Sequence, residues 1–256
     1  DIQPDDAKWD AGDIRYNMIR WTSSPNPIFG GYGPSFTNPR TGEILGADIM
    51  LEWIYLTNRI RYSEIFDETK KHHHCEYTSL KHENKLFASL AAKIKVGSID
   101  ELDRLYKEDL YQLILHEIGH TLGLNHNFAA STLHDNEDIH NPEITYEEGL
   151  SSSVMDYHAL NIAPKGKPQG QYADIKPGKY DILAIRYGYT PDLTNKELSE
   201  IISLTQTDKY LFGNDADDMR SPGKGIDPRI NTSDMTNSPM DYAYERILLS
   251  QSIVSS

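Results

Sequence analysis

The sequence predicts an α+β fold in which a small sheet comes first and helices follow. Two stretches near its start, 14–21 and 43–53, are rich in the β-branched and aromatic residues that strands favour. Apolar residues then recur at near-helical spacing over about 102–122, and shorter helical stretches come later. Strands followed by helices, rather than an alternation of the two, are typical of an α+β domain.

The predicted strands lie on either side of a loop. Residues 14–21, Ile-Arg-Tyr-Asn-Met-Ile-Arg-Trp, predict the first strand. Glycine and proline crowd residues 25–39, which predicts a loop, and Pro-Arg-Thr-Gly at 39–42 predicts a tight turn. The alternation in 43–53 is imperfect, so we expect a strand in the second half of that stretch.

The next segment is ambiguous, and the helix after it has the strongest pattern in the chain. Helical pieces are expected at about 55–68 and 80–94, separated by the polar run 70–75. The strong helix runs over about 102–122, with Asp100 expected as its N-cap and Gly123 as its stop. Its apolar stripe consists of Leu102, Leu105, Leu110, Leu113, Ile114 and Leu122.

The rest of the chain is predicted to mix loops with short helices. Residues 127–153 are polar and interrupted by Pro142 and Gly149, so we expect loops there, with His134 and His140 solvated. Residues 214–238 are expected to be rich in turns. Helices are expected at 181–187, which should be short and buried, at 194–205, and at 239–249 behind Ser238.

Composition excludes several classes of protein. The chain has 256 residues, of which 38% are hydrophobic, and no apolar run is long enough to span a membrane. A net charge of −14 would repel a phosphate backbone, which argues against nucleic acid as a partner. The single cysteine, Cys75, excludes an intrachain disulfide. The first residues contain no signal peptide, and both ends give the impression of a fragment cut from a longer protein.

Residues 116–126 carry the most specific pattern in the chain. His116 and His120 are four apart, so a helix places both imidazoles on one face, where they can bind one zinc ion. Glu117 can then reach a water at the metal without being a ligand. Gly123 allows the chain to turn sharply, because glycine adopts the left-handed conformation cheaply, and the turn brings His126 back as the third ligand.

Other candidate sites are weaker. Residues 72–76, His-His-His-Cys-Glu, could bind a second metal, but a solvated loop is favoured. Asn214, Asp215, Asp217 and Asp218 offer oxygen ligands for calcium, yet their spacing fits no known calcium loop, so a solvated turn is favoured here too.

The order His-Glu-x-x-His-x-x-Gly-x-x-His resembles the zinc-binding signature of the metzincin clan of endopeptidases. Residues 153–157, Ser-Val-Met-Asp-Tyr, resemble the methionine turn of that clan. The resemblance implies that Met155 forms an apolar floor beneath the zinc ligands. It also implies that the phenol of Tyr157 reaches the metal or the tetrahedral intermediate, with simple packing as the alternative.

Two further stretches are similar to metzincin elements. Residues 42–49 resemble the edge strand along which peptide substrates lie, which places Ala47, Asp48 and Ile49 at the substrate. Residues 181–188 resemble the helix after the methionine turn. The chain as a whole looks most similar to a bacterial family of large, exported, multidomain zinc-dependent metalloproteases. It lacks the first strand and long helix of a metzincin, and Asn127 differs from the residue usual after the third histidine.

The resemblance implies a metzincin-like domain with a small twisted sheet, an active-site helix and a mostly irregular or helical lower part. Residues 1–125 would form the upper subdomain, 126–190 the lower subdomain, and 191–256 an extension into further domains. The implied activity is a Zn²⁺-dependent endopeptidase that acts on peptide or protein substrates outside the cytoplasm, with Glu117 as general base and acid.

Two alternatives stay open. The chain could be a zinc-binding module without catalytic activity. It could also be a zincin with the shorter motif, which takes its third ligand from a later glutamate, although Gly123 and His126 argue against this.

Overall fold

The computed structural model describes residues 2–25, 29–53, 99–218 and 225–255. The helical pieces predicted at 55–68 and 80–94 lie outside these ranges, as does the histidine-rich run at 72–76. The chain forms two compact units. One consists of Asp1–Thr78 and Glu117–Gly123, and the other of Ser79–His116 and Leu124–Ser256.

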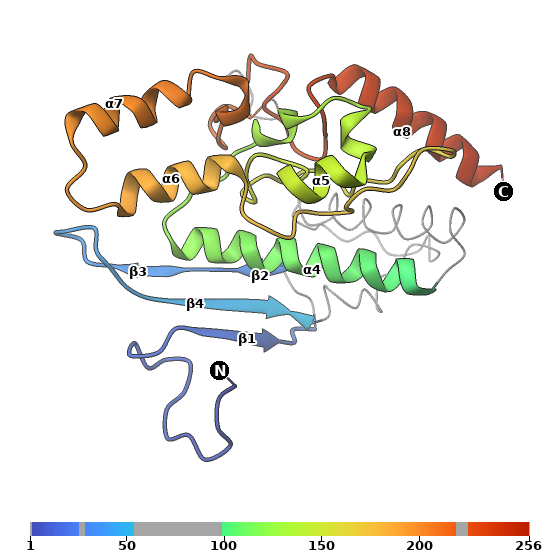
Figure 1. Ribbon diagram of the computed structural model, residues 1–256. Coiled ribbons are helices and arrows are strands. Elements are labelled where there is room, and N and C mark those ends of the chain that lie inside the picture. The colour runs from blue at the N-terminus through green and yellow to red at the C-terminus, as the bar shows by residue number, and fades with distance from the viewer. Residues whose placement is uncertain (1, 26–28, 54–98, 219–224, 256) are drawn as a thin grey trace. The chain divides into compact units, whose positions relative to one another are not determined.

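A mixed sheet forms the main part of the first unit. Its strands are β1 (Met18–Thr22), β2 (Gly31–Tyr32), β3 (Ser35–Thr37) and β4 (Ile44–Glu52). β4 is the central strand, with β1 parallel to it on one side and β2 and β3 antiparallel to it on the other (Figure 1). The strands predicted near 14–21 and in the second half of 43–53 are therefore present, and β4 extends beyond that half, over Ile44–Glu52.

The prediction that Ala47, Asp48 and Ile49 lie on an edge strand is wrong. Asp48 pairs with Met18 of β1, and its N–H donates to the carbonyl of Pro34 on the opposite side, at 3.2 Å. β4 thus has neighbours on both sides, and the outer position belongs to β2 and β3. These two strands lie in the stretch 25–39, whose glycines and prolines predicted only a loop.

Two turns define the ends of the strands. The N–H of Gly42 donates to the carbonyl of Asn38 at 2.8 Å, and Gly42 has a φ of 76°, so the turn predicted at 39–42 is confirmed as the link between β3 and β4. Before β1, the N–H of Tyr16 donates to the carbonyl of Asp13 at 3.0 Å. This turn explains why the first strand begins at Met18 and not at Ile14.

Helices dominate the rest of the described chain. The α-helices are α4 (Ile99–Thr121), α5 (Pro142–Glu148), α6 (Lys179–Tyr189), α7 (Asn195–Leu204) and α8 (Pro239–Val254). Short 3₁₀ helices lie at Ala130–Leu133, Asp138–His140 and Asp208–Tyr210. Asp100 lies inside the first turn of α4 and so is not its N-cap. Within the described ranges, no helix is long and apolar enough to cross a membrane.

The predicted loop at 127–153 contains a helix, and the two residues taken as interruptions mark its ends. Asn141 caps α5, Pro142 is its first residue, and Gly149 follows its last residue with a φ of 88°. The expectation that His134 and His140 are solvated is also wrong. Both are buried, and Nε2 of His134 lies 2.8 Å from the carbonyl of Gly149.

The core of the second unit joins helices from distant parts of the chain. Leu105 of α4 and Leu249 of α8 belong to one buried cluster, together with Leu160, Ile162, Tyr172 and Ala173. A second cluster includes Tyr242 of α8 and Met235. The last helix is therefore packed into the same core as α4, the helix that carries two of the motif histidines.

Two adjacent leucines on α8 test this packing. Leu249 is buried at 8% exposure, whereas Leu248 is 46% exposed. Leu249→Ala should lower the free energy of unfolding by about 2–4 kcal/mol, because it removes buried methyl groups and leaves a cavity. Leu248→Ala should cost under about 1 kcal/mol. Chemical denaturation would measure both, and equal losses would contradict the packing of α8 described here.

Candidate metal centre

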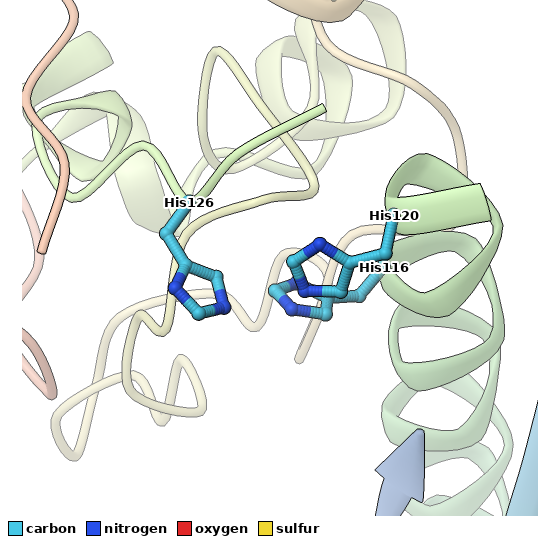
Figure 2. Close-up of side chains that lie close together, drawn as sticks. All are labelled: His116, His120 and His126. Atoms are coloured by element: carbon cyan, nitrogen blue, oxygen red, sulfur yellow. The ribbon is translucent and has the colours of Figure 1, made fainter. Parts of the chain in front are cut away.

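Three histidines converge at the end of α4. His116 and His120 lie one turn apart on the helix, so their rings project from the same face (Figure 2). After Thr121 the chain turns at Gly123, whose φ of 88° is in the left-handed region, and the N–H of Gly123 donates to the carbonyl of His120 at 2.9 Å. His126 then comes back toward the helix. One ligand atom from each ring lies within 4.8 Å of the others.

Two of the rings are oriented by acceptors at Nδ1. Nδ1 of His116 lies 2.8 Å from the carbonyl oxygen of Val154, and Nδ1 of His126 lies 2.8 Å from Oδ2 of Asp215. Since these oxygens can only accept, Nδ1 carries the proton, and the neutral ring keeps its lone pair on Nε2. Both rings can therefore offer Nε2 to a metal. Three imidazole nitrogens at this separation fit zinc, which binds imidazole readily.

Tyr157 lies against two of the histidines. Its hydroxyl donates to Nε2 of His126 at 2.6 Å, and its ring lies 4.9 Å from that of His116, centroid to centroid. Phe128, which is fully buried, packs against both Tyr157 and His126. The phenol is thus held at the histidine cluster by ring contacts on its sides and a hydrogen bond at its tip.

The backbone around Met155 connects to the ligand loop. Met155 is fully buried, and its carbonyl accepts from the N–H of Asn127, next to His126, at 3.0 Å. Val154, one residue earlier, supplies the acceptor for His116. Residues 154–157 therefore contact His116 through the carbonyl of Val154 and His126 through the side chain of Tyr157, and the carbonyl of Met155 binds the residue next to His126.

Two buried carboxylates hold this loop in place. Asp181, at the start of α6, accepts from the N–H of Val154 at 2.9 Å and from the hydroxyl of Ser153. Asp174 accepts from the N–H of Leu150 at 2.7 Å and from the hydroxyl of Ser151. Each carboxylate satisfies backbone groups that would otherwise be buried without partners, so the loop has a defined shape.

Gly178 lets α6 approach the loop closely. A Cβ placed on Gly178 would lie 2.1 Å from the carbonyl oxygen of Ser152, so any side chain there would force the two segments apart. The N–H of Gly178 also donates to Asp181, at 2.8 Å. The glycine and the aspartate together fix the distance between α6 and residues 152–154.

Glu117 is buried and lies against the strand β2. It is 5% exposed, and within the first unit its carboxylate lies beside Gly31. A Cβ on Gly31 would lie 2.4 Å from Oε1 of Glu117, and one on Gly33 would lie 2.5 Å from the backbone oxygen of Glu117. A larger residue at Gly31 would displace the carboxylate of Glu117, and one at Gly33 would displace its backbone.

A sequence profile of the Met-zincin family matches residues 98–256, more than half of the chain. The chain belongs to the Met-zincin family. The match confirms the predicted resemblance to metzincins. Together with the small mixed sheet and the three converging histidines, it confirms an α+β fold of the zincin type. No curated protein and no solved structure matches the chain. The Met-zincin chain thus carries a domain of the zinc metallopeptidase type.

No second metal cluster accompanies the three histidines in the described ranges of this Met-zincin domain. Asn214, Asp215, Asp217 and Asp218 do not converge. Asp217 instead accepts from the backbone N–H of Asn214 at 3.1 Å, within its own turn. The expectation that this whole turn is solvated is wrong, because Asp218 is buried. The histidine-rich run 72–76 lies outside the described residues.

Several residues of the centre were not predicted from the sequence. Asp174, Asp181 and Asp215 each contact a segment at least 23 residues away in the chain. An aspartate in a polar stretch does not reveal its partner, so the sequence indicated Asp215 only as an oxygen ligand for calcium and indicated no role for Asp174 or Asp181. Gly31 and Gly33 were visible as a glycine pair, but their pattern predicted a loop and not a site next to Glu117.

The carboxyl of Asp156 is neutral in the folded Met-zincin domain at pH 7. Burial raises its pKa to about 8, and the nearby carboxylate of Asp234 adds to the rise. Ser131 donates to both side chains, and Oδ1 of Asp156 has no hydrogen-bond partner among the described residues. Burial would lower the pKa of His158, but its hydrogen bond to Asp174 and the charge of Asp174 raise that pKa overall.

The substitution Asp156→Asn tests this protonation state. In the wild-type protein the folded state holds a proton at Asp156 that the unfolded state releases near its ordinary pKa. The contribution of Asp156 to stability is therefore complete below about pH 4 and declines as pH rises toward about 8. Asparagine resembles the neutral carboxyl and does not titrate. As pH rises over this range, the free energy of unfolding of the variant should increase relative to wild type by about 1.4 kcal/mol for each pH unit.

Chemical denaturation of the metal-free protein at a series of pH values would measure the difference. Asp6→Asn, which changes an exposed aspartate, serves as the control and should follow the wild-type profile. A constant difference between Asp156→Asn and wild type from pH 4 to 8 would show that Asp156 is ionised in the fold.

Proposed function

We propose that this Met-zincin domain is a zinc-dependent endopeptidase. The observation that carries the proposal is the convergence of His116, His120 and His126, whose ligand atoms lie within 4.8 Å of one another. These three side chains would hold the metal. Catalytic zinc sites use three protein ligands and keep a fourth position open for water or substrate, whereas structural sites use four.

Glu117 is the proposed general base and acid. A zinc ion held by these histidines would supply Lewis-acid chemistry and would lower the pKa of a coordinated water to about 7. The carboxylate of Glu117 would accept a proton during attack on the scissile carbonyl and pass it to the leaving amine. Its burial supports this role, because the carboxylate lies in a site with little water, directly after the first ligand in sequence.

Tyr157 and Met155 complete the proposed centre. The hydroxyl of Tyr157 lies 2.6 Å from Nε2 of His126, so it is placed to donate a hydrogen bond to the oxyanion of the intermediate. Such a donor contributes about 3 kcal/mol in other acyl-transfer enzymes. Met155, fully buried next to Val154 and Asp156, would provide apolar packing beneath the ligands, and Gly123 the turn that returns His126.

The peptide substrate would pair with the outer edge of β2 and β3. β4 has strands on both sides, while among the described strands β2 and β3 pair only with β4. An extended peptide gains main-chain hydrogen bonds by adding to a sheet edge. The carboxylate of Glu117 beside Gly31 supports this placement. From the sequence resemblance alone, we propose that the domain acts outside the cytoplasm as part of a larger protein.

The substitution Glu117→Gln tests the proposed base. It should lower peptide cleavage by at least about 100-fold, because the amide cannot accept the proton, while zinc still binds at one equivalent. Turnover of a peptide library and metal content would be measured on the same preparation. Glu147→Gln on α5, which changes an exposed glutamate, should leave both unchanged.

The outcomes separate the open alternatives. Zinc at one equivalent without cleavage by the wild-type protein would identify a binding module. Retained turnover in Glu117→Gln would remove Glu117 as the base.

Gly31→Ala tests the placement of β2 beside the carboxylate. The added methyl group would lie 2.4 Å from Oε1 of Glu117, so the carboxylate must move. A displacement of about 1 Å can cost up to about 100-fold in rate, and we expect kcat/KM to fall by about 10- to 100-fold with zinc affinity retained.

Gly188→Ala is the matched control for Gly31→Ala. The same methyl group there meets no atom within 4 Å, and Gly188 lies in α6, where alanine is preferred. Its kcat/KM should stay at the wild-type value. Equal effects of the two substitutions would contradict the role of Gly31.

A further inference from the structure

We propose that Asp215 is a positioning residue for His126, so that the turn at 213–217 is part of the metal centre. The inference rests on the proposed zinc site and assigns a role to a segment far from the motif in sequence. Its carboxylate would fix the ring of His126 so that Nε2 points at the metal. Side chains that orient metal ligands in this way are typically worth 10- to 100-fold in metal affinity.

The contact between the two side chains is direct. Oδ2 and Oδ1 of Asp215 lie 2.8 and 3.1 Å from Nδ1 of His126. The carboxylate can only accept, so it selects the tautomer with the proton on Nδ1 and leaves Nε2 for the metal. His116 obtains the same orientation from the carbonyl of Val154. His126 lies in a loop, where no helix restrains its ring, so it depends more on a side-chain partner.

Asn127 brings the turn to His126. Its fully buried amide donates from Nδ2 to the carbonyl of Leu211 at 3.0 Å and accepts at Oδ1 from the N–H of Gly213 at 3.1 Å. The N–H of Phe128 donates to the carbonyl of Gly213 at 2.7 Å. Three hydrogen bonds thus join residues 127–128 to 211–213. These bonds hold Gly213 beside residues 127–128, and Asp215 follows two residues later in the chain.

The turn itself has a defined conformation. Oδ1 of Asn214 accepts from the N–H of Ala216 at 2.9 Å, and the N–H of Asp217 donates to the carbonyl of Asn214 at 2.9 Å. Gly213 lies close to Ile230, because a Cβ on it would lie 2.6 Å from Cδ1 of that residue and would force the side chain to shift. The side chains of Asn214 and Asp217 accept hydrogen bonds from backbone N–H groups of the turn, while the side chain of Asp215 accepts from His126.

An affinity measurement on the full chain tests the inference. Metal-free protein would compete for ZnCl₂ with a chromogenic chelator. Asp215→Ala should bind zinc about 10- to 100-fold more weakly than wild type. Asp215→Asn keeps an acceptor but loses the charge, so its affinity should lie between the two. Asp208→Asn removes an exposed carboxylate from the same region and should leave the affinity unchanged.

Two further readouts separate positioning from general stability. The side chain of Asp215 is 65% exposed, so the melting temperature of the metal-free variants should equal that of wild type. Nitrogen-15 spectra of the histidine rings should show the Nδ1–H tautomer at His126 in metal-free wild type and a mixture of tautomers in Asp215→Ala.

The outcomes distinguish the two proposals. Wild type that binds one zinc, with Asp215→Ala within about threefold of it, would overturn the role of Asp215 and leave the zinc site intact. Wild type that binds no zinc would overturn both. A tenfold loss confined to the Asp215 variants, with unchanged melting temperature, would support the assignment.

Discussion

The proposed metal centre depends on the orientation of imidazole rings. A histidine can offer a lone pair to a metal only if its other nitrogen keeps the proton, and here that proton is held in two different ways. The carbonyl of Val154 accepts it from His116, and the carboxylate of Asp215 accepts it from His126. Other segments of the second unit hold these two acceptors beside the histidines through hydrogen bonds to Val154 and to residues 211–213.

Buried carboxylates connect the acceptors to the core. Asp181 binds the N–H of Val154, and Asp174 binds residues 150–151, so α6 and the segment before it determine where the carbonyl for His116 lies. Burying an ionised group is costly unless hydrogen bonds compensate. Asp174 and Asp181 accept hydrogen bonds from several donors each, whereas burial raises the pKa of Asp156 to about 8.

Local patterns were enough to predict the helix, the motif and the family, because each depends on residues close together in the chain. The spacing of His116 and His120 fixes their geometry through the helix alone. Boundaries were less predictable: Pro142 and Gly149 suggested interruptions, yet they mark the first residue of α5 and the residue after its end. The short strands β2 and β3 were not predicted, because two or three residues are too few to show an alternating pattern. Both strands also depend on β4 for their hydrogen bonds.

Contacts between distant segments could not be predicted. Asp215 lies 89 residues from His126, and nothing in the turn around it indicates a histidine as its partner. The burial of His134 and His140 has the same origin, since it follows from the packing of 127–153 against later segments and not from local polarity.

The two acceptors differ in what mutation can do to them. Every residue at position 154 has a backbone carbonyl, so substitution there leaves the acceptor for His116 in place. The acceptor for His126 is a side chain at position 215, and a single codon change can remove or replace it. With the role proposed for Asp215, variation at a site outside the signature motif would change how firmly the domain retains its metal, while the three histidines stay the same.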